Sequence, residues 1–372
     1  IVTIGGILIN TVIIPNSTIV TINGQEIKTG DFQTRVQMER DRLVNEYNSI
    51  QAYAYQIEDA TQQQTYLYYL SQIEAQLEPN SLGETVLNQM IDEVFIINEA
   101  ESRGITVTDE EVDDYYYSLF GYYPNGVPTP TVSEVLPTST MSPTQLALIT
   151  PTPGSADDSG AVTTVGEQPQ PTSVSQEDFE TSREGYLDRM KAYGVDEDYF
   201  RNLIRIQLFR DKLNEDLAKG ITAPPQEQVW ARHILVDDLE TANTLLDELN
   251  NGGDFGEMAA EYNPDSTSAT GGDLGWFGRG QMIPEFEDAA FSGEVGDIVG
   301  PVETQYGFHL IQIIGKQEVP ADQATIDNLV FTALTDLLNA AKENADIVFA
   351  DNWINRTPTE PDIIHVASTT GS

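Results

Sequence analysis

Two of the three histidines in this chain of 372 residues, His233 and His309, lie within one stretch that also carries an ordered series of short motifs. Imidazole rings can donate and accept hydrogen bonds, and a carboxylate beside them, such as Asp265, would titrate together with them. The chain has no cysteine, which excludes disulfides, zinc–thiolate sites and thiol nucleophiles. In order, the motifs are Ala-Arg-His-Ile-Leu-Val (231–236), Asp265, Gly-Gly-Asp-Leu-Gly-Trp-Phe (271–277), Arg-Gly-Gln-Met (279–282), Phe-Glu-Asp-Ala (286–289), Gly-Pro-Val (300–302) and Gly-Phe-His-Leu-Ile (307–311).

This ordered series resembles the parvulin family of peptidyl-prolyl cis-trans isomerases. An X–Pro bond rotates slowly because amide resonance sets a barrier of ~18–20 kcal/mol. A catalyst needs no covalent intermediate, because it only has to favour the twisted amide over both planar forms. A dry pocket helps, since the planar amide is the more polar form. The resemblance therefore implies an apolar pocket with a few oriented polar groups, and neither a metal nor a cofactor.

Four apolar residues match the proline pocket of that family. Without the resemblance, they would be read as ordinary core residues. With it, we expect them to bind the proline ring, the last as part of the same wall: Leu274, Met282, Phe286 and Phe277.

The resemblance also implies a polar network. His233 and His309 match the paired histidines, which hold hydrogen bonds beneath the substrate amide without acting as a general base. Asp265 matches a position that is Cys in some parvulins and Asp in many exported ones, where it would orient the network. Thr304 matches a hydroxyl in the same network. Alternatively, the histidines are satisfied core residues and Asp265 only forms a turn.

Phosphate recognition is not expected in this region. Gly271, Gly272 and Gly275 lack the Gly-x-Gly-x-x-Gly spacing, and no Lys-Ser/Thr pair follows, so we assign them to tight turns. Phosphate-directed parvulins carry a basic cluster after the first strand, whereas this chain has Asp-Asp-Leu-Glu at 237–240. Those carboxylates would repel a phosphoserine, so unmodified X–Pro segments are the expected substrates.

The net charge of −42, from 18 basic and 60 acidic residues, restricts the kinds of partner that the chain can bind. It repels nucleic acid and anionic lipid headgroups, so we expect no nucleic-acid partner. The charge also keeps the protein soluble, which would suit a protein that handles sticky clients. Adaptation to a salty or acidic habitat is the alternative reading. Nothing in the sequence indicates an oligomeric state.

The patterns predict an α+β fold. A small antiparallel sheet with helices around it, a parvulin domain, is expected at 226–318, with strands near 230–236, 274–277, 298–303 and 307–314, and helices near 239–251, 255–262 and 284–292. This domain interrupts a mostly helical module that resembles the SurA N-terminal domain. Three segments of the chain form that module: 19–120, 176–224 and 320–352. The first segment begins with a predicted hairpin at 19–27.

Three further segments lack such patterns. Residues 121–175 are rich in Pro, Thr and Ser and are predicted to be a disordered insert. Residues 353–372 are polar and are expected to form a loose tail. Residues 1–18 are mostly apolar, too short to span a bilayer, and are read as a membrane-proximal segment that could end a signal anchor, or as a β-rich segment.

This arrangement resembles the extracytoplasmic parvulin foldases of the PrsA-like and SurA-like kind. It implies an exported isomerase and chaperone with a membrane tether upstream of Ile1, acting on unfolded or nascent exported polypeptides that contain X–Pro bonds. The alternative is a holdase chaperone whose parvulin domain binds peptide without catalysis. A scaffold that offers 121–175 as a ligand is a third idea, but no PxxP cluster with flanking basic residues supports it.

Overall fold

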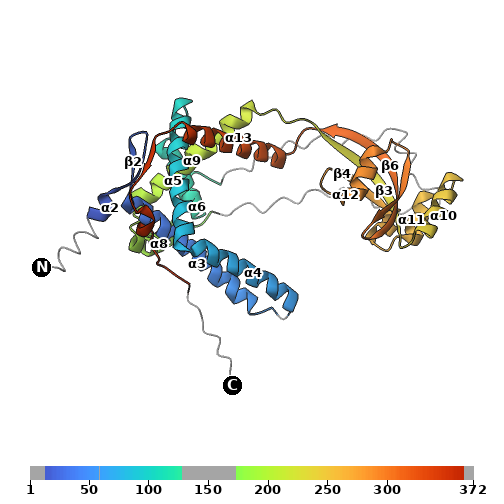
Figure 1. The fold of residues 1–372 in the computed structure, drawn as a ribbon, viewed down its shortest axis with the longest axis horizontal. Coiled ribbons are helices and arrows are strands. Elements are labelled where there is room, and N and C mark those ends of the chain that lie inside the picture. Colours follow the sequence, from blue (N-terminus) through green and yellow to red (C-terminus); the bar gives the residue numbers. More distant parts are fainter. Residues whose placement is uncertain (1–12, 58, 128–172, 364–372) are drawn as a thin grey trace, which may run out of the picture. The chain divides into compact units, whose positions relative to one another are not determined.

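The structure is a computed structural model that describes residues 13–57, 59–127 and 173–363 (Figure 1). The described residues divide into two compact units. We call residues 13–127, 173–221 and 330–363 the helical unit, and residues 222–329 the sheet unit. Most of the predicted insert, at 128–172, lies outside the described residues, as do 1–12 of the predicted membrane-proximal segment and 364–372 of the predicted tail.

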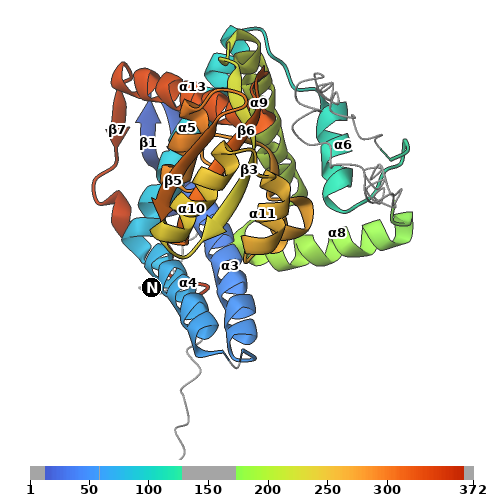
Figure 2. The ribbon, with the colours of Figure 1, turned by 90° about the vertical axis from the view of Figure 1, so that its right-hand side faces the viewer.

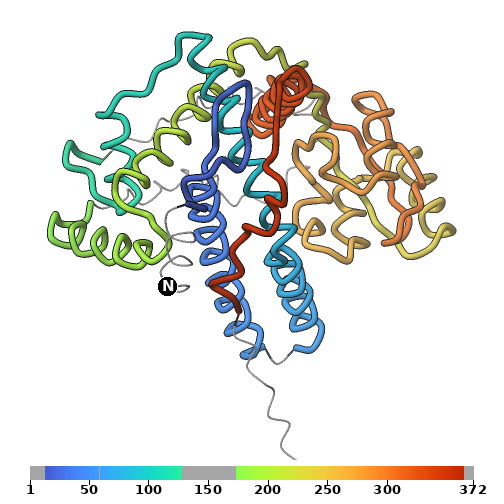
Figure 3. Tube along the Cα trace, turned by 60° about the vertical axis from the view of Figure 1, so that its left-hand side comes forward, coloured from blue at the N-terminus to red at the C-terminus, as the bar shows by residue number. Residues whose placement is uncertain are grey.

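The helical unit opens with the predicted hairpin. Strands β1 (Thr18–Ile22) and β2 (Gln25–Lys28) are joined by Asn23 and Gly24, both with positive φ, as a two-residue hairpin turn requires. A strand that the sequence did not reveal, β7 (Ile347–Phe349), pairs with β1, so the N-terminal hairpin and the C-terminal segment lie side by side (Figure 3). A strand of three residues is too short to show an alternating pattern.

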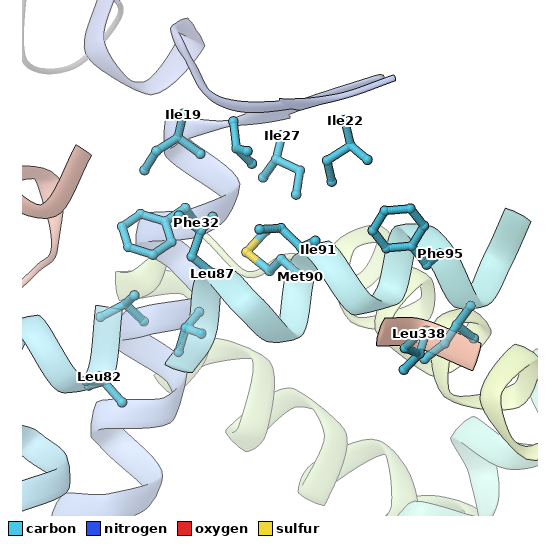
Figure 4. Close-up of a cluster of buried hydrophobic side chains, with 14 of the residues drawn as sticks. Ile19, Ile22, Ile27, Phe32, Leu82, Leu87, Met90, Ile91, Phe95 and Leu338 are labelled. Carbon is cyan, nitrogen blue, oxygen red and sulfur yellow. The ribbon is translucent and has the colours of Figure 1, made fainter. Parts of the chain in front are cut away.

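Long helices make up the rest of this unit. The largest apolar cluster lies between the hairpin and helices α3, α4, α5, α9 and α13, where Ile19, Phe32, Leu87 and Ile91 are almost completely buried (Figure 4). A second cluster joins α6, α8 and α9 through aromatic rings. A capping box formed by Thr108 and Glu111 opens α6. The helices are α2 (Ile14–Asn16), α3 (Thr29–Ala54), α4 (Ala60–Leu77), α5 (Pro79–Ser102), α6 (Asp109–Leu119), α8 (Gln176–Met190), η2 (Lys191–Tyr193), α9 (Glu197–Gly220), α13 (Gln323–Glu343) and η4 (Trp353–Arg356).

The prediction of a loose tail from residue 353 is wrong for 353–363. Trp353 meets the ring of Phe32 edge-on at 6.1 Å, and Thr357 is buried. Arg40 of α3, only 2% exposed, donates to the carbonyl oxygens of Leu77 at 2.6 Å and Pro361 at 2.8 Å. A buried guanidinium must have its N–H groups satisfied, and here the C-terminal segment supplies acceptors, which fixes that segment on the helices.

Removing the Arg40 side chain should therefore destabilise the protein strongly. Arg40→Ala leaves two carbonyl oxygens without their donor, and we expect a loss of about 3 kcal/mol in the free energy of unfolding. Arg42→Ala is the matched control, because Arg42 is exposed and pairs only with Glu39 and Glu46 on its own helix, so its loss should cost less than about 1 kcal/mol. Urea unfolding of the full chain measures both, and equal losses would show that Arg40 does not anchor the C-terminal segment.

The sheet unit carries one antiparallel sheet of strand order β4-β3-β6-β5. The predicted strands and helices are all present, and the α+β prediction is confirmed. The elements are β3 (Gln226–Val236), α10 (Leu239–Asn250), α11 (Phe255–Tyr262), η3 (Ser266–Thr270), β4 (Asp273–Gly278), α12 (Pro284–Ser292), β5 (Ile298–Thr304) and β6 (Gly307–Val319).

The two faces of this sheet are covered by different helices. Ile234, Val236 and Leu310 pack under α10 and α11, which lie beside the strands in Figure 2. Ala231 and Ile311 pack under α12. Because side chains alternate along a strand, His233 and His309 must share the α12 face with Ala231 and Ile311.

Across the described ranges, none of the helices combines the length and the apolarity that a membrane span requires.

Candidate active site

The two histidines lie on the neighbouring central strands of the sheet. His233 on β3 pairs with Ile311 on β6, and His309 stands two residues along the same face, in the diagonal position. Diagonal side chains are within reach of each other when they are aromatic. The two rings stack with centroids 5.4 Å apart and an interplanar angle of 16°, and each residue is only 5% exposed. The register of two strands thus brings together residues 76 positions apart.

A chain of hydrogen bonds runs through this pair. His233 Nδ1 and His309 Nδ1 are 3.2 Å apart, so one must donate and the other accept. His309 Nε2 lies 2.9 Å from Thr304 Oγ1, and His233 Nε2 lies 3.1 Å from Thr267 Oγ1. Thr267 in turn contacts Asp265 Oδ1 at 2.5 Å.

The carboxylate fixes the direction of every proton in the chain. An ionised Asp265 can only accept, so the Thr267 hydroxyl donates to it and must accept from His233 Nε2–H. His233 Nδ1 then accepts from His309 Nδ1–H, which leaves His309 Nε2 to accept from the Thr304 hydroxyl. All donated protons point toward Asp265, with both rings neutral.

The pKa values agree with this assignment. Burial, followed by the neighbouring His233, lowers the pKa of His309 to about 4, and Asp265 only partly opposes this shift. Burial also lowers the pKa of His233, against the attraction of Asp265. Burial acts to raise the pKa of Asp265, but the hydrogen bonds from the Thr267 hydroxyl and amide prevail and hold it below its usual value. At neutral pH the site is therefore one carboxylate and two uncharged imidazoles.

Asp265 itself lies at the edge of the site. Its side chain is partly exposed, and its Oδ2 is 3.5 Å from His233 Nε2, so its main link to the histidines is through Thr267. Asp265 also caps the short η3 turn, accepting from the Thr267 amide at 2.9 Å. Asp265 thus has both of the roles considered from the sequence: it forms a turn, and it contacts the hydrogen-bond network of the histidines.

Thr267 and Asn263 are the members of the network that sequence reasoning missed. Asn263, buried, donates to Thr267 Oγ1 at 2.9 Å and to the carbonyl oxygen of His233 at 3.0 Å, and accepts from the Leu235 amide at 2.9 Å. The spacing Asn263-x-Asp265-x-Thr267, which puts three polar groups on one short turn, was the available signal.

An apolar surface adjoins the imidazoles on the α12 face. Phe286 points its ring edge-on at both histidines, with centroids 5.9 Å from His233 and 5.2 Å from His309. Leu274 and Met282 are partly buried and pack against the same cluster, so part of each side chain stays accessible. Phe286 is 3% exposed and Phe277, which packs behind it, is 2% exposed, so the accessible part of this apolar surface comes from Leu274 and Met282.

Gly272 allows β4 to approach β3 beside this site. Its φ is +83°, and a Cβ there would lie 2.1 Å from the carbonyl oxygen of His233. The close approach brings the Gly272 carbonyl within 2.9 Å of the His233 amide. The predicted turn role of this glycine is confirmed, and the contact adds a reason: any side chain would displace the strand that carries His233.

The structure therefore brings together His233, His309, Thr304 and, through Thr267, Asp265, next to Phe286. No cluster of acidic and histidine side chains suited to a metal ion occurs among the residues that the structure describes. What the arrangement offers is a neutral, largely buried polar floor beside an apolar surface, which suits a non-covalent reaction.

Comparison with known families defines the class of each part. Residues 218–317 match the family model of the PPIC-type PPIase domain, and residues 4–147 match that of the SurA-like N-terminal domain. The resemblance to parvulins drawn from the motifs is confirmed: the sheet unit is a PPIC-type domain, and it is joined to a segment of SurA-like type.

Among named proteins, the chain is similar to the foldase protein PrsA. It is 35% identical to that of Geobacillus kaustophilus over 182 residues, which is 44% of this chain and 64% of that protein. It is 50% identical to that of Halalkalibacterium halodurans over 92 residues, 24% of this chain and 28% of that protein. The crystal structure of peptidylprolyl isomerase (PrsA) from Bacillus cereus matches with 27% identity and a TM-score of 0.33, over 50% of this chain and 80% of that one. The chain thus spans less than two thirds of the first two relatives.

The neutral histidine pair gives a pH prediction. Because its pKa is lowered to about 4, His309 should stay uncharged in the folded protein until the pH falls well below 6.5. The unfolded chain takes up this proton near pH 6.5, so the stability that this group contributes is complete above that pH and is lost as the pH falls from there toward about 4. Nitrogen-detected NMR of the imidazoles, assigned with a His309→Gln variant, measures the titration. A midpoint near 6.5 for His309 in the folded protein would contradict the neutral stack.

Proposed function

We propose that this chain is a peptidyl-prolyl cis-trans isomerase and a foldase for unfolded polypeptides. The observation that carries the proposal is the neutral pair His233–His309, hydrogen-bonded at both ends and placed edge-on against Phe286 within a PPIC-type domain. This site offers no activated nucleophile and needs none, because rotation about an X–Pro bond breaks no covalent bond.

In the proposed mechanism, the proline ring is held by the accessible parts of Met282 and Leu274, above the almost buried ring of Phe286. The substrate amide then passes over the imidazole pair. A planar amide loses its hydration there, whereas the twisted amide, being less polar, loses less, so the site lowers the barrier. Asp265 is linked to the histidines through Thr267 and keeps the donated protons of the hydrogen-bond chain oriented in one direction. Its negative charge also acts on one side of the substrate amide.

For the whole protein we propose a broader role. The SurA-like segment and the remainder of the helical unit would serve as a chaperone module that holds unfolded or nascent exported clients with X–Pro bonds. We place the protein outside the cytoplasm, joined to a membrane by a tether upstream of Ile1. The similarity to PrsA foldases supports the foldase part of this proposal.

The second candidate function is a holdase whose PPIC-type domain binds peptide without catalysis. Such a protein would suppress client aggregation but leave the rate of X–Pro exchange unchanged. The retained network from Thr304 to Asp265 favours catalysis, because peptide binding alone does not require oriented imidazoles.

Truncating the pocket should weaken catalysis. Met282→Ala removes part of the apolar surface and should lower kcat/KM for a short X–Pro peptide about tenfold. Met258→Ala is the matched control, because Met258 is also a partly buried methionine but lies on α11 and packs into the cluster on the opposite face of the sheet. A protease-coupled isomerisation assay measures both variants. If the wild-type protein gives only the uncatalysed rate while still preventing aggregation, the holdase reading holds.

Phosphorylation of the residue before proline should not speed turnover. The exposed acidic run after β3 contains Asp237 and Glu240, with Asp238 capping α10, so a phosphate would meet like charge there. We expect a phosphoserine–proline peptide to react no faster than its unmodified twin, in paired NMR exchange measurements at equal ionic strength. Faster exchange of the phosphorylated peptide would contradict the assignment of unmodified substrates.

A further inference from the structure

The helical unit contains a cavity of about 890 Å³ that the isomerase chemistry does not use. Its walls come from α3, α5, α8 and α9. The apolar part of the lining includes two of the chain's six methionines, whose unbranched side chains adapt to varied partners. The apolar residues are Met38, Val86, Tyr186, Met190, Leu203 and Ile206.

Four arginines also line this cavity, in a chain whose net charge is −42. Two of them are paired: Arg35 with Glu93 at 2.5 Å, and Arg42 with Glu39 at 2.7 Å. The side chains of the other two, the exposed Arg189 and the partly buried Arg210, make no hydrogen bond, ion pair or ring contact with any described residue. Every Lys and Arg of the chain lies in the described part, and only Lys191 shares this lack of a partner.

The carboxylates that line the cavity do not compensate these two arginines. Glu93 and Glu39 are held by Arg35 and Arg42. Asp41 accepts only from neutral donors, the Tyr193 hydroxyl and the Asn45 amide, each at 3.0 Å, so one carboxylate without a cation partner stands against the two arginines. In a chain with 60 acidic residues, most basic side chains find a carboxylate. Two guanidinium groups that find none, both facing one cavity with an apolar lining, indicate a place for a carboxylate that comes from elsewhere.

We propose that this cavity binds extended segments of client polypeptides in which Asp or Glu side chains alternate with apolar ones. The proposal rests on the foldase function above and names the client class that the helical unit selects. Guanidinium groups form bidentate, charge-assisted hydrogen bonds with carboxylates, while the partly buried Met38, Leu203 and Ile206 accept the apolar side chains. Elsewhere the acidic surface repels such segments, so the cavity is where this chain holds them.

The binding test uses the full chain and short fluorescein-labelled peptides without proline, so that the PPIC-type domain contributes no proline binding. One peptide alternates Leu with Glu and has an amidated C-terminus. Its isosteric twin has Gln at each Glu. A third carries Gln and a free C-terminal carboxylate, which separates side-chain carboxylates from a chain end. Fluorescence anisotropy should give tighter binding of the Glu peptide than of the other two.

Matched variants test the arginines. Arg189→Gln combined with Arg210→Gln should weaken binding of the Glu peptide about tenfold and leave the Gln peptide unchanged. Lys191→Gln is the control, because it removes a basic residue that also lacks a partner but does not line the cavity. Circular dichroism and melting temperature confirm that each variant is folded.

Two outcomes overturn the proposal. One is equal affinity for the Glu and Gln peptides. The other is a loss of affinity in Lys191→Gln as large as in the arginine variant, which would show that any positive charge near the cavity has the same effect. Preference for the free chain end over the side chains would replace the proposed client class. The isomerisation assay is run on the same variants and should not change. Absence of catalysis in the wild-type protein therefore counts against the proposed enzyme, whereas absence of Glu discrimination counts only against this cavity.

Discussion

The contact between His233 Nδ1 and His309 Nδ1 constrains the whole sheet unit, because it can exist only while at most one of the two rings is protonated. Two imidazolium rings would direct two N–H groups at each other inside a low-dielectric site. Burial under α12 keeps the rings neutral, and the carboxylate of Asp265 sets which nitrogen carries each proton. Phe286, whose ring faces both imidazoles, is itself only 3% exposed. Burial therefore accounts both for the neutral imidazoles and for the low exposure of the apolar surface beside them.

The contact between the two neutral imidazole rings depends on the exact register of the strands that carry them. The pairing of β3 with β6 places His233 and His309 in diagonal positions, and a slip of one residue in either strand would put the two rings on opposite faces of the sheet. Gly272 lets β4 approach the backbone of His233, and Asn263 ties the turn before η3 to the same strand through the carbonyl of His233 and the amide of Leu235. The polar network and the strand register therefore stabilise each other.

The sequence was sufficient to predict the elements of the sheet unit, because each strand and helix carries its own local period and the motifs follow in a known order. It was also sufficient to select His233, His309, Thr304 and Phe286, which the structure brings together. It did not reveal Thr267, whose part depends on the geometry of one short turn. Nor did it reveal that residues 353–363 are packed, because their polar composition resembles a tail and their anchor, Arg40, lies more than 300 positions away. Periodicity reports which face of an element is buried, but not which distant group satisfies a buried charge.

The cavity of the helical unit differs from the histidine site in how completely its polar and charged side chains are paired. In the sheet unit, each polar atom of the buried network has its partner inside the protein, and this self-sufficiency keeps the rings neutral and the site free of competing charge. In the helical unit, Arg35 pairs with Glu93 and Arg42 with Glu39, while the side chains of Arg189 and Arg210 pair with no described residue. An acidic chain pairs its cations wherever geometry allows, so a cation without a partner carries more information here than in a chain of balanced charge. On the two proposals made above, complete internal pairing belongs to the part that acts on a neutral bond, and incomplete pairing to the part that would recognise charge on a client.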